Sequence, residues 1–372
     1  MMIVYMIESS MPQTVSTGPT LTNITYGGRL IVKYGLVVLL LLMVGRVTFN
    51  SFVAYWKATH PAPPPPPTVG FGKLPQLQFP ERNSEEVPLE YKLETPTGSL
   101  PEYGDRGKVY FMPKMTANLL ADQKAKSIAA TYGFLFEPSI LSTERYRFKK
   151  SQPLETTIDI NTRTLHFDLQ SDFLARPELV ANTVLPNNFQ AVDSVKNYLK
   201  SADLLPDDVA TAAGEVLYLK SLGGELAPAV SLSDADFIQV DLNRNPIDTV
   251  YRMYTPDGYT GVISAIISGG LQNNNTIVDL QYAYNAVDYS QMHTYPLRSA
   301  RTAWQLLQAG EGFIAQKGDA DVAVVRSVSM AYYDSYDEQD YLQPIYVFEN
   351  VDSGFLAFVS ALDPTFVQSP VQ

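Results

Sequence analysis

The alternation of hydrophobic and polar positions divides the chain into an apolar N-terminal segment, a proline-rich stretch and a long mixed region. The most apolar run extends from Tyr34 to Gly45 and continues through further apolar positions to Tyr55 and Trp56. As a helix rising about 1.5 Å per residue, Tyr34 to Trp56 is long enough to cross a bilayer core of about 30 Å. We therefore predict a transmembrane helix over residues 30–57, with aromatic side chains at both ends.

Two other interpretations of this segment are a buried helix of a soluble protein and a cleaved signal peptide. The proline run that follows and the aromatic residues that bracket the segment disfavour the first. The lack of a small-x-small cleavage site, and the 28 residues before Arg29, disfavour the second. Arg29 and Lys33 precede the span and Lys57 follows it, a bias that predicts a cytoplasmic N-terminus and a C-terminal domain outside the cell membrane.

Arg46 is the charged residue between Tyr34 and Trp56, and it is the candidate site residue of the sequence. Near mid-membrane an arginine costs about 2.5–3.5 kcal/mol on insertion scales, which the leucine run outweighs. Either Arg46 snorkels in a monomer, or it makes an intramembrane contact with a partner helix. A shifted register, Leu30 to Val47, would instead place Arg46 near the far interface and Lys33 inside.

The segments on either side of the span are predicted to lack regular structure. Residues 1–29 are expected to form a flexible cytoplasmic tail. Residues 58–104 are expected to form a proline-rich extended linker, because Pro63 to Pro67 enforce a polyproline II rod and further prolines follow. Within this linker, Gly70 to Pro75 is expected to lie as an extended arm along the domain. The folded part is predicted to begin near Lys108.

The rest of the chain is predicted to form three units, 105–186, 187–296 and 297–372. In each unit one helix precedes antiparallel strands. The predicted helices are 117–130, 189–201 and one that starts at Ser299 and ends at Gly310. The predicted strands are 144–149, 155–160, 164–169, 215–220, 236–242, 249–254, 260–268, 277–284, 322–332, 342–349 and 355–360. The core face of the first helix is expected to carry Leu119, Leu120, Ala125, Ile128 and Ala129. The predicted helices and strands together indicate an α+β fold with repeated helix-plus-antiparallel-sheet units.

The charge is unevenly distributed along the chain. The 372 residues carry a net charge of −12, but residues 1–57 are at +3 and the remainder is at −15. An acidic body makes nucleic acid an improbable partner, since phosphate binding depends on clustered Lys and Arg. Cysteine is absent, which excludes disulfides, thiolate metal sites and a cysteine nucleophile, and favours a bacterial-type protein.

Histidine and motif searches give no catalytic constellation. Of the three histidines, His60 lies in the linker, His166 is expected on the solvent face of its strand, and His293 is expected in a loop. No HExxH, GxSxG, SxxK or Walker-type sequence occurs. A serine–lysine pair stays open, as do paired carboxylates. We predict no catalytic residue, no metal and no cofactor.

Two acidic stretches invite a calcium interpretation. Around Asp241, the sixth and twelfth loop positions of an EF-hand would be Pro246 and Arg252 instead of Gly and Glu, so a solvated hairpin is expected there. A second cluster contains Asp334, Asp337, Glu338 and Asp340. It is expected to form a charged loop tip, with weak cation binding as the alternative.

The last unit carries a resemblance to known families. The segments Ser299–Gly310, Val328–Tyr333 and Tyr341–Glu349 resemble the end of YycH/YycI-type proteins, which are membrane-anchored regulators of a sensor histidine kinase. They are also similar to PepSY-like modules, in which an alanine-bearing helix precedes strands that end in a proline–aromatic segment. The resemblance covers about residues 190–360 and lies in the pattern of residues.

The sequence therefore predicts a single-pass, signal-anchored membrane protein with an extracytoplasmic regulatory or scaffolding module. Its expected partners are the lipid bilayer, through one helix, and a membrane or surface protein. A cell-wall or polysaccharide binder that uses exposed tyrosines is the alternative function, and a hydrolase is the third.

Overall fold

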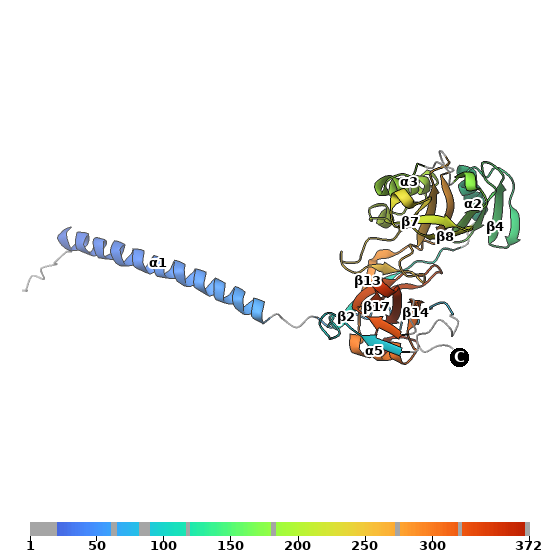
Figure 1. Ribbon diagram of the computed structural model, residues 1–372. Coiled ribbons are helices and arrows are strands. Elements are labelled where there is room, and N and C mark those ends of the chain that lie inside the picture. Colours follow the sequence, from blue (N-terminus) through green and yellow to red (C-terminus); the bar gives the residue numbers. More distant parts are fainter. Residues whose placement is uncertain are drawn as a thin grey trace, which may run out of the picture. The chain divides into compact units, whose positions relative to one another are not determined.

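The computed structural model describes residues 21–60, 65–81, 90–116, 120–179, 184–271, 276–318 and 322–368. The chain forms two compact units, residues 1–66 and residues 67–372. Helix α1 (Leu21–Thr59) makes up most of the described part of the first unit (Figure 1).

Helix α1 is long and apolar enough to cross a membrane between Gly28 and Thr59. Its most apolar window has a mean hydropathy of 2.2, and none of that window is buried. A membrane anchor and a signal sequence both meet this description. The helix begins at Leu21, so residues 21–29 are helical and the expectation of a flexible tail is wrong for them. Residues 1–20 lie outside the described residues.

The second unit mixes helices and strands. Its α-helices are α2 (Ala121–Thr131), α3 (Asn188–Ser201), α4 (Asp207–Ala210) and α5 (Ala300–Gln308). Its strands are β1 (Glu90–Leu93), β2 (Arg106–Phe111), β3 (Ser139–Ser142), β4 (Arg145–Lys150), β5 (Thr156–Asn161), β6 (Phe167–Ser171), β7 (Glu215–Leu222), β8 (Glu225–Pro228), β9 (Phe237–Leu242), β10 (Met253–Tyr254), β11 (Ile263–Ser268), β12 (Ile277–Tyr282), β13 (Asp288–Pro296), β14 (Phe313–Gln316), β15 (Val322–Val325), β16 (Ser327–Tyr333), β17 (Tyr341–Asn350) and β18 (Phe355–Ser360).

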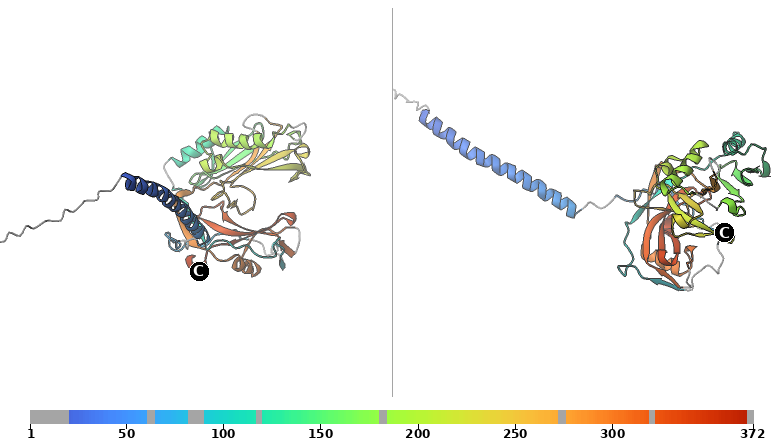
Figure 2. Two further views of the ribbon diagram at one scale, coloured as in Figure 1. Left: turned by 90° about the vertical axis from the view of Figure 1, so that its left-hand side faces the viewer. Right: turned by 45° about the horizontal axis from the view of Figure 1, so that its top comes forward.

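Among the described residues, nine strands form one sheet in the order β3-β4-β5-β6-β12-β11-β9-β7-β8. Helices α2 and α3 cover one face of this sheet, as Figure 2 shows in teal and yellow-green. Alternating apolar residues of the strands point toward these helices. The other face carries polar residues together with a second buried apolar cluster that includes Leu219, Phe237 and Val278. We call this sheet with α2, α3 and α4 the first lobe.

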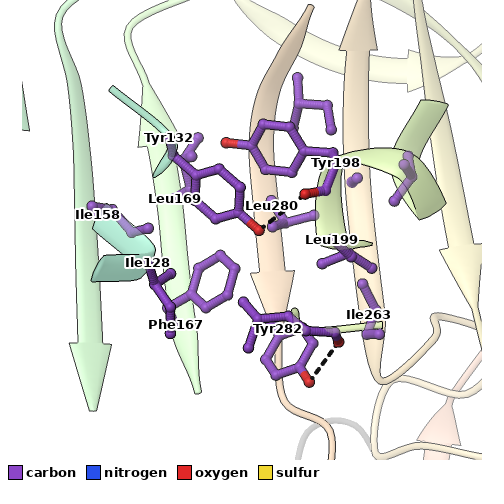
Figure 3. Close-up of a cluster of buried hydrophobic side chains, with 14 of the residues drawn as sticks. Ile128, Tyr132, Ile158, Phe167, Leu169, Tyr198, Leu199, Ile263, Leu280 and Tyr282 are labelled. Atoms are coloured by element: carbon purple, nitrogen blue, oxygen red, sulfur yellow. Dashed lines mark hydrogen bonds between the residues drawn. The ribbon is translucent and has the colours of Figure 1, made fainter. Parts of the chain in front are cut away.

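The core between helices and sheet in the first lobe is rich in aromatic rings (Figure 3). The rings of Tyr132 in the α2 C-cap and Tyr198 in α3 stack with centroids 4.0 Å apart. The Tyr132 hydroxyl donates to the Tyr198 carbonyl oxygen, and the Tyr282 hydroxyl donates to that of Leu204. The phenols of Tyr132 and Tyr282 therefore have hydrogen-bond acceptors, which offset the cost of removing them from water.

The second lobe is built on a seven-stranded sheet, again counting only described strands. Its main path is β10-β16-β17-β18-β14, and β2 pairs with both β17 and β13. Helix α5 packs Ala303, Trp304 and Leu307 on one face. Ser299 caps this helix as expected, since its Oγ accepts from the Thr302 amide. Strand β1 pairs in parallel with β15 on the same side.

Residues 67–81, which we call the strap, are built into the second lobe. Leu74 is fully buried and Leu77 is 6% exposed. The Leu74 amide donates to the Phe366 carbonyl oxygen, and the Gln368 amide donates back to that of Leu74, each at 2.8 Å. The expected extended arm over residues 70–75 is confirmed. The predicted start of the folded part near Lys108 is wrong, because the strap and β1 both belong to the fold.

The structure groups the strands differently from the three predicted units. Strands of 105–186 and of 187–296 share the nine-stranded sheet, because β6 pairs with β12 through Phe167–Tyr282 and Leu169–Leu280. The apolar rows of the two halves thereby join into one core face. Strands β2 and β13, from these same two units, instead complete the sheet of the second lobe.

Several element boundaries also differ from the predictions. Helix α2 begins at Ala121, and Leu120 is 55% exposed because it lies at the N-cap; Leu119 is outside the described residues. The predicted strand 249–254 shrinks to β10, since Asp248 and Thr249 adopt positive φ in a turn. Strands β1, β2, β3, β8, β13 and β14 had no counterpart among the predictions.

Candidate functional site

The first candidate site is Arg46 within helix α1. Within the described residues its guanidinium makes no ion pair or hydrogen bond, and the side chain is exposed. The neighbouring Thr48 hydroxyl is satisfied by its own helix, since it lies 3.0 Å from the carbonyl oxygens of Val44 and Gly45. In a span of leucine and valine, Arg46 is thus the side chain whose polar groups still need partners from outside α1.

The second candidate site is a buried polar network where the two lobes meet. Arg244 follows β9 in the first lobe, and Asp334 follows β16 in the second lobe. The Arg244 Nε lies 2.7 Å from Oδ2 of Asp334, and both side chains are fully enclosed. Arg244 also donates to the Asn285 carbonyl oxygen, and the Asn285 side chain donates to the carbonyl oxygens of Ser335 and Asp337.

Asp208 in α4 is the second carboxylate of this network. Its Oδ2 accepts from Arg244 at 3.0 Å and from the Tyr289 hydroxyl at 2.8 Å, and its Oδ1 accepts from the Tyr284 hydroxyl at 3.0 Å. The Arg244 guanidinium also lies 4.3 Å from the centre of the Tyr284 ring. Burial alone would lower the pKa of Arg244, but the Asp334 carboxylate raises it well above its usual value. Arg244 therefore stays charged and ties four segments together.

Both acidic stretches singled out in the sequence lie in or near this network, and each contains buried residues that the expected solvated hairpin and charged loop tip would not have. Asp337 in the second stretch is exposed, as expected for a loop tip. Asp241 is 7% exposed and accepts from the Gly261 amide, and Arg244 in the expected hairpin is 2% exposed. In the second stretch, Asp334, Glu338 and Asp340 pair with Arg244, Arg163 and Lys114. Basic side chains thus occupy the places that a cation would need. No group of three or more metal-ligating side chains occurs among the described residues.

The pairing of Arg244 with Asp334 had no signal in the sequence. The two residues are separated by 90 positions, and each lies in a polar stretch of the kind that usually forms an exposed turn. Only the folding of the two sheets against each other brings these turns together and removes them from water.

The histidines have structural surroundings. His166 is half-buried, not on the solvent face as expected: its Nε2 lies 3.2 Å from the Tyr284 carbonyl oxygen, and burial lowers the pKa of its imidazole. His293 lies in β13, not in a loop. Its ring packs edge-on against Phe71 of the strap, and its Nδ1 lies 3.2 Å from the Thr68 hydroxyl. His60 stacks on Trp56 at the end of α1.

Gly70 shows why the strap fits beside His293. A Cβ at this position would overlap the imidazole ring, so a larger residue could not lie there without moving the strand or the strap. Tyr295, two residues after His293, is fully buried. Its hydroxyl accepts from the Phe71 amide at 2.9 Å and donates to the Gly72 carbonyl oxygen at 3.0 Å. Strand β13 therefore holds the strap through specific contacts.

The polar face of the nine-stranded sheet carries a row of carboxylates from neighbouring strands. Asp159 pairs with Arg147 and Asp168 pairs with Arg145. Asp279 in β12 has no hydrogen-bond donor or cation beside it among the described residues. Burial and the neighbouring Asp168 carboxylate raise the pKa of Asp279 to about 6. Arginine side chains pair with Asp159 and Asp168, and these carboxylates belong to no group of metal-ligating side chains among the described residues.

Two of the surface pockets of the second lobe bring a serine near a lysine or enclose an arginine. One, of about 720 Å³, is lined by Asp257, Phe313, Lys317, Asp352 and Ser353, among others. It brings a serine near a lysine, but the Ser353 hydroxyl donates to the Asn350 carbonyl oxygen. The other, of about 310 Å³, lies between the strap and α5 and contains Arg298, whose Nε donates to the Leu362 carbonyl oxygen. Neither pocket presents a nucleophile hydrogen-bonded to a base.

Comparison with protein-family models and with curated proteins gives no match for this chain.

Proposed function

We propose that this protein is a membrane-tethered, non-enzymatic regulatory or scaffolding module that binds protein partners outside the cytoplasm. The observation that carries the proposal is the succession of two features in one chain. An apolar helix of membrane-spanning length ends at Thr59, and the strap that begins at Pro67 has its Leu74 in the core of a folded domain. A chain that continues from such a helix into a folded domain would keep that domain at a membrane.

The value of such a tether lies in effective concentration. A domain linked to a bilayer by a few residues meets membrane-bound partners at local concentrations that free diffusion would not reach. An enzyme acting on a soluble substrate gains little from this, whereas a binding module gains affinity directly. The resemblance of residues 190–360 to YycH/YycI-type regulators and PepSY-like modules supports the same function.

The arrangement of the polar groups also favours a binding module over a hydrolase. The most deeply buried charged groups, Arg244 and Asp334, are engaged with each other. His293 holds the strap, and Ser353 bonds to a backbone carbonyl. These groups stabilise the domain, and a stable domain with fixed surfaces is what partner binding requires.

The polysaccharide-binding alternative would need exposed tyrosines on a sheet or in a groove. The largest fully buried side chains of the domain include Tyr295, Tyr332, Tyr333 and Tyr346. The face of the nine-stranded sheet away from the helices carries aspartate, glutamine and serine beside a buried apolar cluster that contains no tyrosine. We therefore favour a protein partner.

We further propose that the first lobe contains two copies of one helix-plus-antiparallel-sheet unit. Helix α2 precedes β3 to β6, and α3 precedes β7 to β12. The strands of the first half run in chain order from the outer edge, β3 to β6, whereas those of the second half have the order β8-β7-β9-β11-β12, and β10 lies in the other sheet. The shared succession of one helix and several antiparallel strands is what supports this proposal.

Complementation of a deletion strain, at matched protein levels, tests the function. The chain with residues 28–59 replaced by an unrelated leucine-rich span of equal length should restore the phenotype, and the domain exported without a span should not. Ser353→Ala and Lys317→Gln should both complement. Full activity of the untethered domain would refute the tethered-module function. Loss of activity in Ser353→Ala, with the fold intact, would point to an enzyme.

A further inference from the structure

The outer edge of the first lobe has an unusual surface. Strand β3 is the terminal strand of the nine-stranded sheet and pairs only with β4. All four of its side chains are exposed, including Ile140 at 70% and Leu141 at 46%. Leu135 and Phe136, in the turn that leads from α2 to β3, are 79% and 76% exposed. We call Leu135, Phe136, Ile140 and Leu141 the edge patch; Figure 1 shows β4, the neighbour of β3, at the outer end of this lobe.

The backbone N–H and C=O groups on the outer side of β3 are also available for hydrogen bonding. Its inner hydrogen bonds go to β4, and no described residue pairs with its outer side. Folded proteins usually block such an edge with charge or proline, because a free edge recruits other strands. The opposite edge follows this rule: β8 begins with Glu225 and ends with Pro228. Pro138 precedes β3, and a bulge lies between Ile140 and Ser142, but the strand itself (Ser139–Ser142) contains no charge and no proline. Its outer side can therefore accept a short strand.

Charge indicates which kind of strand fits. Residues 121–150 carry a net charge of +3, although residues 58–372 as a whole carry −15. Lys149 of β4 is exposed and makes no ion pair with any residue that the structure describes. A second copy of β3 would bring two positive patches together, which disfavours self-pairing. An acidic segment would be attracted.

A lipid surface fits the edge patch less well than a peptide does. Anionic lipid would satisfy the positive charge and the apolar side chains, but it would leave the outer N–H and C=O groups of β3 without partners in an apolar medium. An extended peptide satisfies all three features, because its main chain continues the ladder and its side chains alternate between the two faces.

We propose that β3 binds an extended segment of a partner protein, with alternating acidic and apolar residues, as a tenth strand of the sheet. This inference rests on the proposed function and assigns it a surface. The edge patch supplies apolar contacts to the added strand. Lys149 of β4, whose side chain has no ion pair among the described residues, attracts its carboxylates.

The test uses the full chain in nanodiscs and a labelled peptide of about eight residues that alternates Val and Glu. Fluorescence anisotropy should show saturable binding, and hydrogen exchange should slow at the amides of 139–142. Ile140→Glu should weaken binding about tenfold or more, since it puts a carboxylate opposite the incoming ones. Val230→Glu, at a residue that is 95% exposed near the opposite edge, should leave binding unchanged.

A second peptide keeps the test decisive if Ile140→Glu does not fold. N-methylation of the Val–Glu peptide retains its side chains but removes main-chain donors, so it should abolish binding to the unaltered protein. Equal binding of both peptides would refute strand addition. Slow hydrogen exchange at the amides of 139–142 in the absence of peptide would also refute the proposal. If that protection depends on phosphatidylglycerol, the edge patch binds a lipid surface. If it depends on protein concentration, the edge patch binds a second copy of the chain. If no peptide binds while complementation still requires the tether, the edge is not the site but the proposed function stands.

Discussion

The Nε of Arg244 and the Oδ2 of Asp334 lie 2.7 Å apart, and neither side chain is reached by solvent. This pair joins a loop of the first lobe to a loop of the second. A buried ion pair does little for stability compared with apolar side chains of the same size, but the loss of one partner leaves an uncompensated charge. The relationship between the lobes therefore depends on both residues being present.

Asp334→Asn should lower the free energy of unfolding by about 3–5 kcal/mol, because Arg244 then lies buried beside a neutral amide, with Asp208 its remaining carboxylate. Chemical denaturation of the variant and the unaltered protein measures the difference. Arg326→Gln is the matched control: its partner Asp352 is 77% exposed at the side chain, and the expected change is below about 1 kcal/mol. Equal effects of the two variants would show that the Arg244 pair is not buried in solution.

The strap makes a second prediction. A chain that starts at residue 65 should be soluble and cooperatively folded, whereas one that starts at residue 105 lacks Leu74, Leu77 and β1 and should expose apolar surface to dyes. In the full chain, Leu74→Ala should cost about 2–5 kcal/mol, since it leaves a cavity among buried neighbours. Thermal unfolding and dye binding are the measurements. Equal melting temperatures for the two truncated chains would mean that the strap is not part of the fold.

Asp279 gives a prediction on pH. Its pKa of about 6 in the folded state exceeds the usual value of about 3.9 for an unfolded chain, so the folded protein holds this proton more tightly. The free energy of unfolding should therefore fall as the pH rises from about 4 to 6, and by no more than about 3 kcal/mol.

Asp279→Asn should remove that loss, so the variant should be more stable than the unaltered protein at pH 7.5 and nearly equal to it at pH 4. Urea denaturation across this pH range provides the measurement. Asp172→Asn, at an exposed position, is the control and should not change the pH profile. A variant that is destabilised at pH 7.5 would mean that Asp279 has a favourable partner in solution.

Arg46 gives a prediction about helix α1. Arg46→Leu should improve insertion of the segment by about 2.5–3.5 kcal/mol, because a charged side chain leaves the apolar span. A glycosylation-based insertion assay measures this, with Val47→Leu as the control that changes only apolar bulk. Association in detergent then separates the two roles: weaker association of Arg46→Leu assigns it to a partner helix, and unchanged association assigns it to snorkelling. No improvement in insertion would place Arg46 outside the apolar core.

Local pattern was enough to determine some elements of this protein. The apolar run before Trp56 predicted α1, and the helical spacing of Ala191, Val195, Tyr198 and Leu199 predicted the buried face of α3. The alternation of Phe167 and Leu169 predicted a half-buried strand. In each case the burial follows from a period of 3.6 or 2, which neighbouring residues fix by themselves.

The tertiary structure alone determined where distant segments meet. Phe167 lies opposite Tyr282 in the sheet, and Arg244 forms an ion pair with Asp334. His293 packs against Phe71. The residues of each pair are far apart in the sequence, so local pattern does not predict these contacts. The prolines of 58–104 concealed that Leu74 lies in the core, because proline excludes helix and central strand but not an extended strap. The polar turns that contain Arg244 and Asp334 were expected to be solvated. Their burial depends on the packing of two sheets against each other, and the alternation of residues within one strand carries no information about that packing.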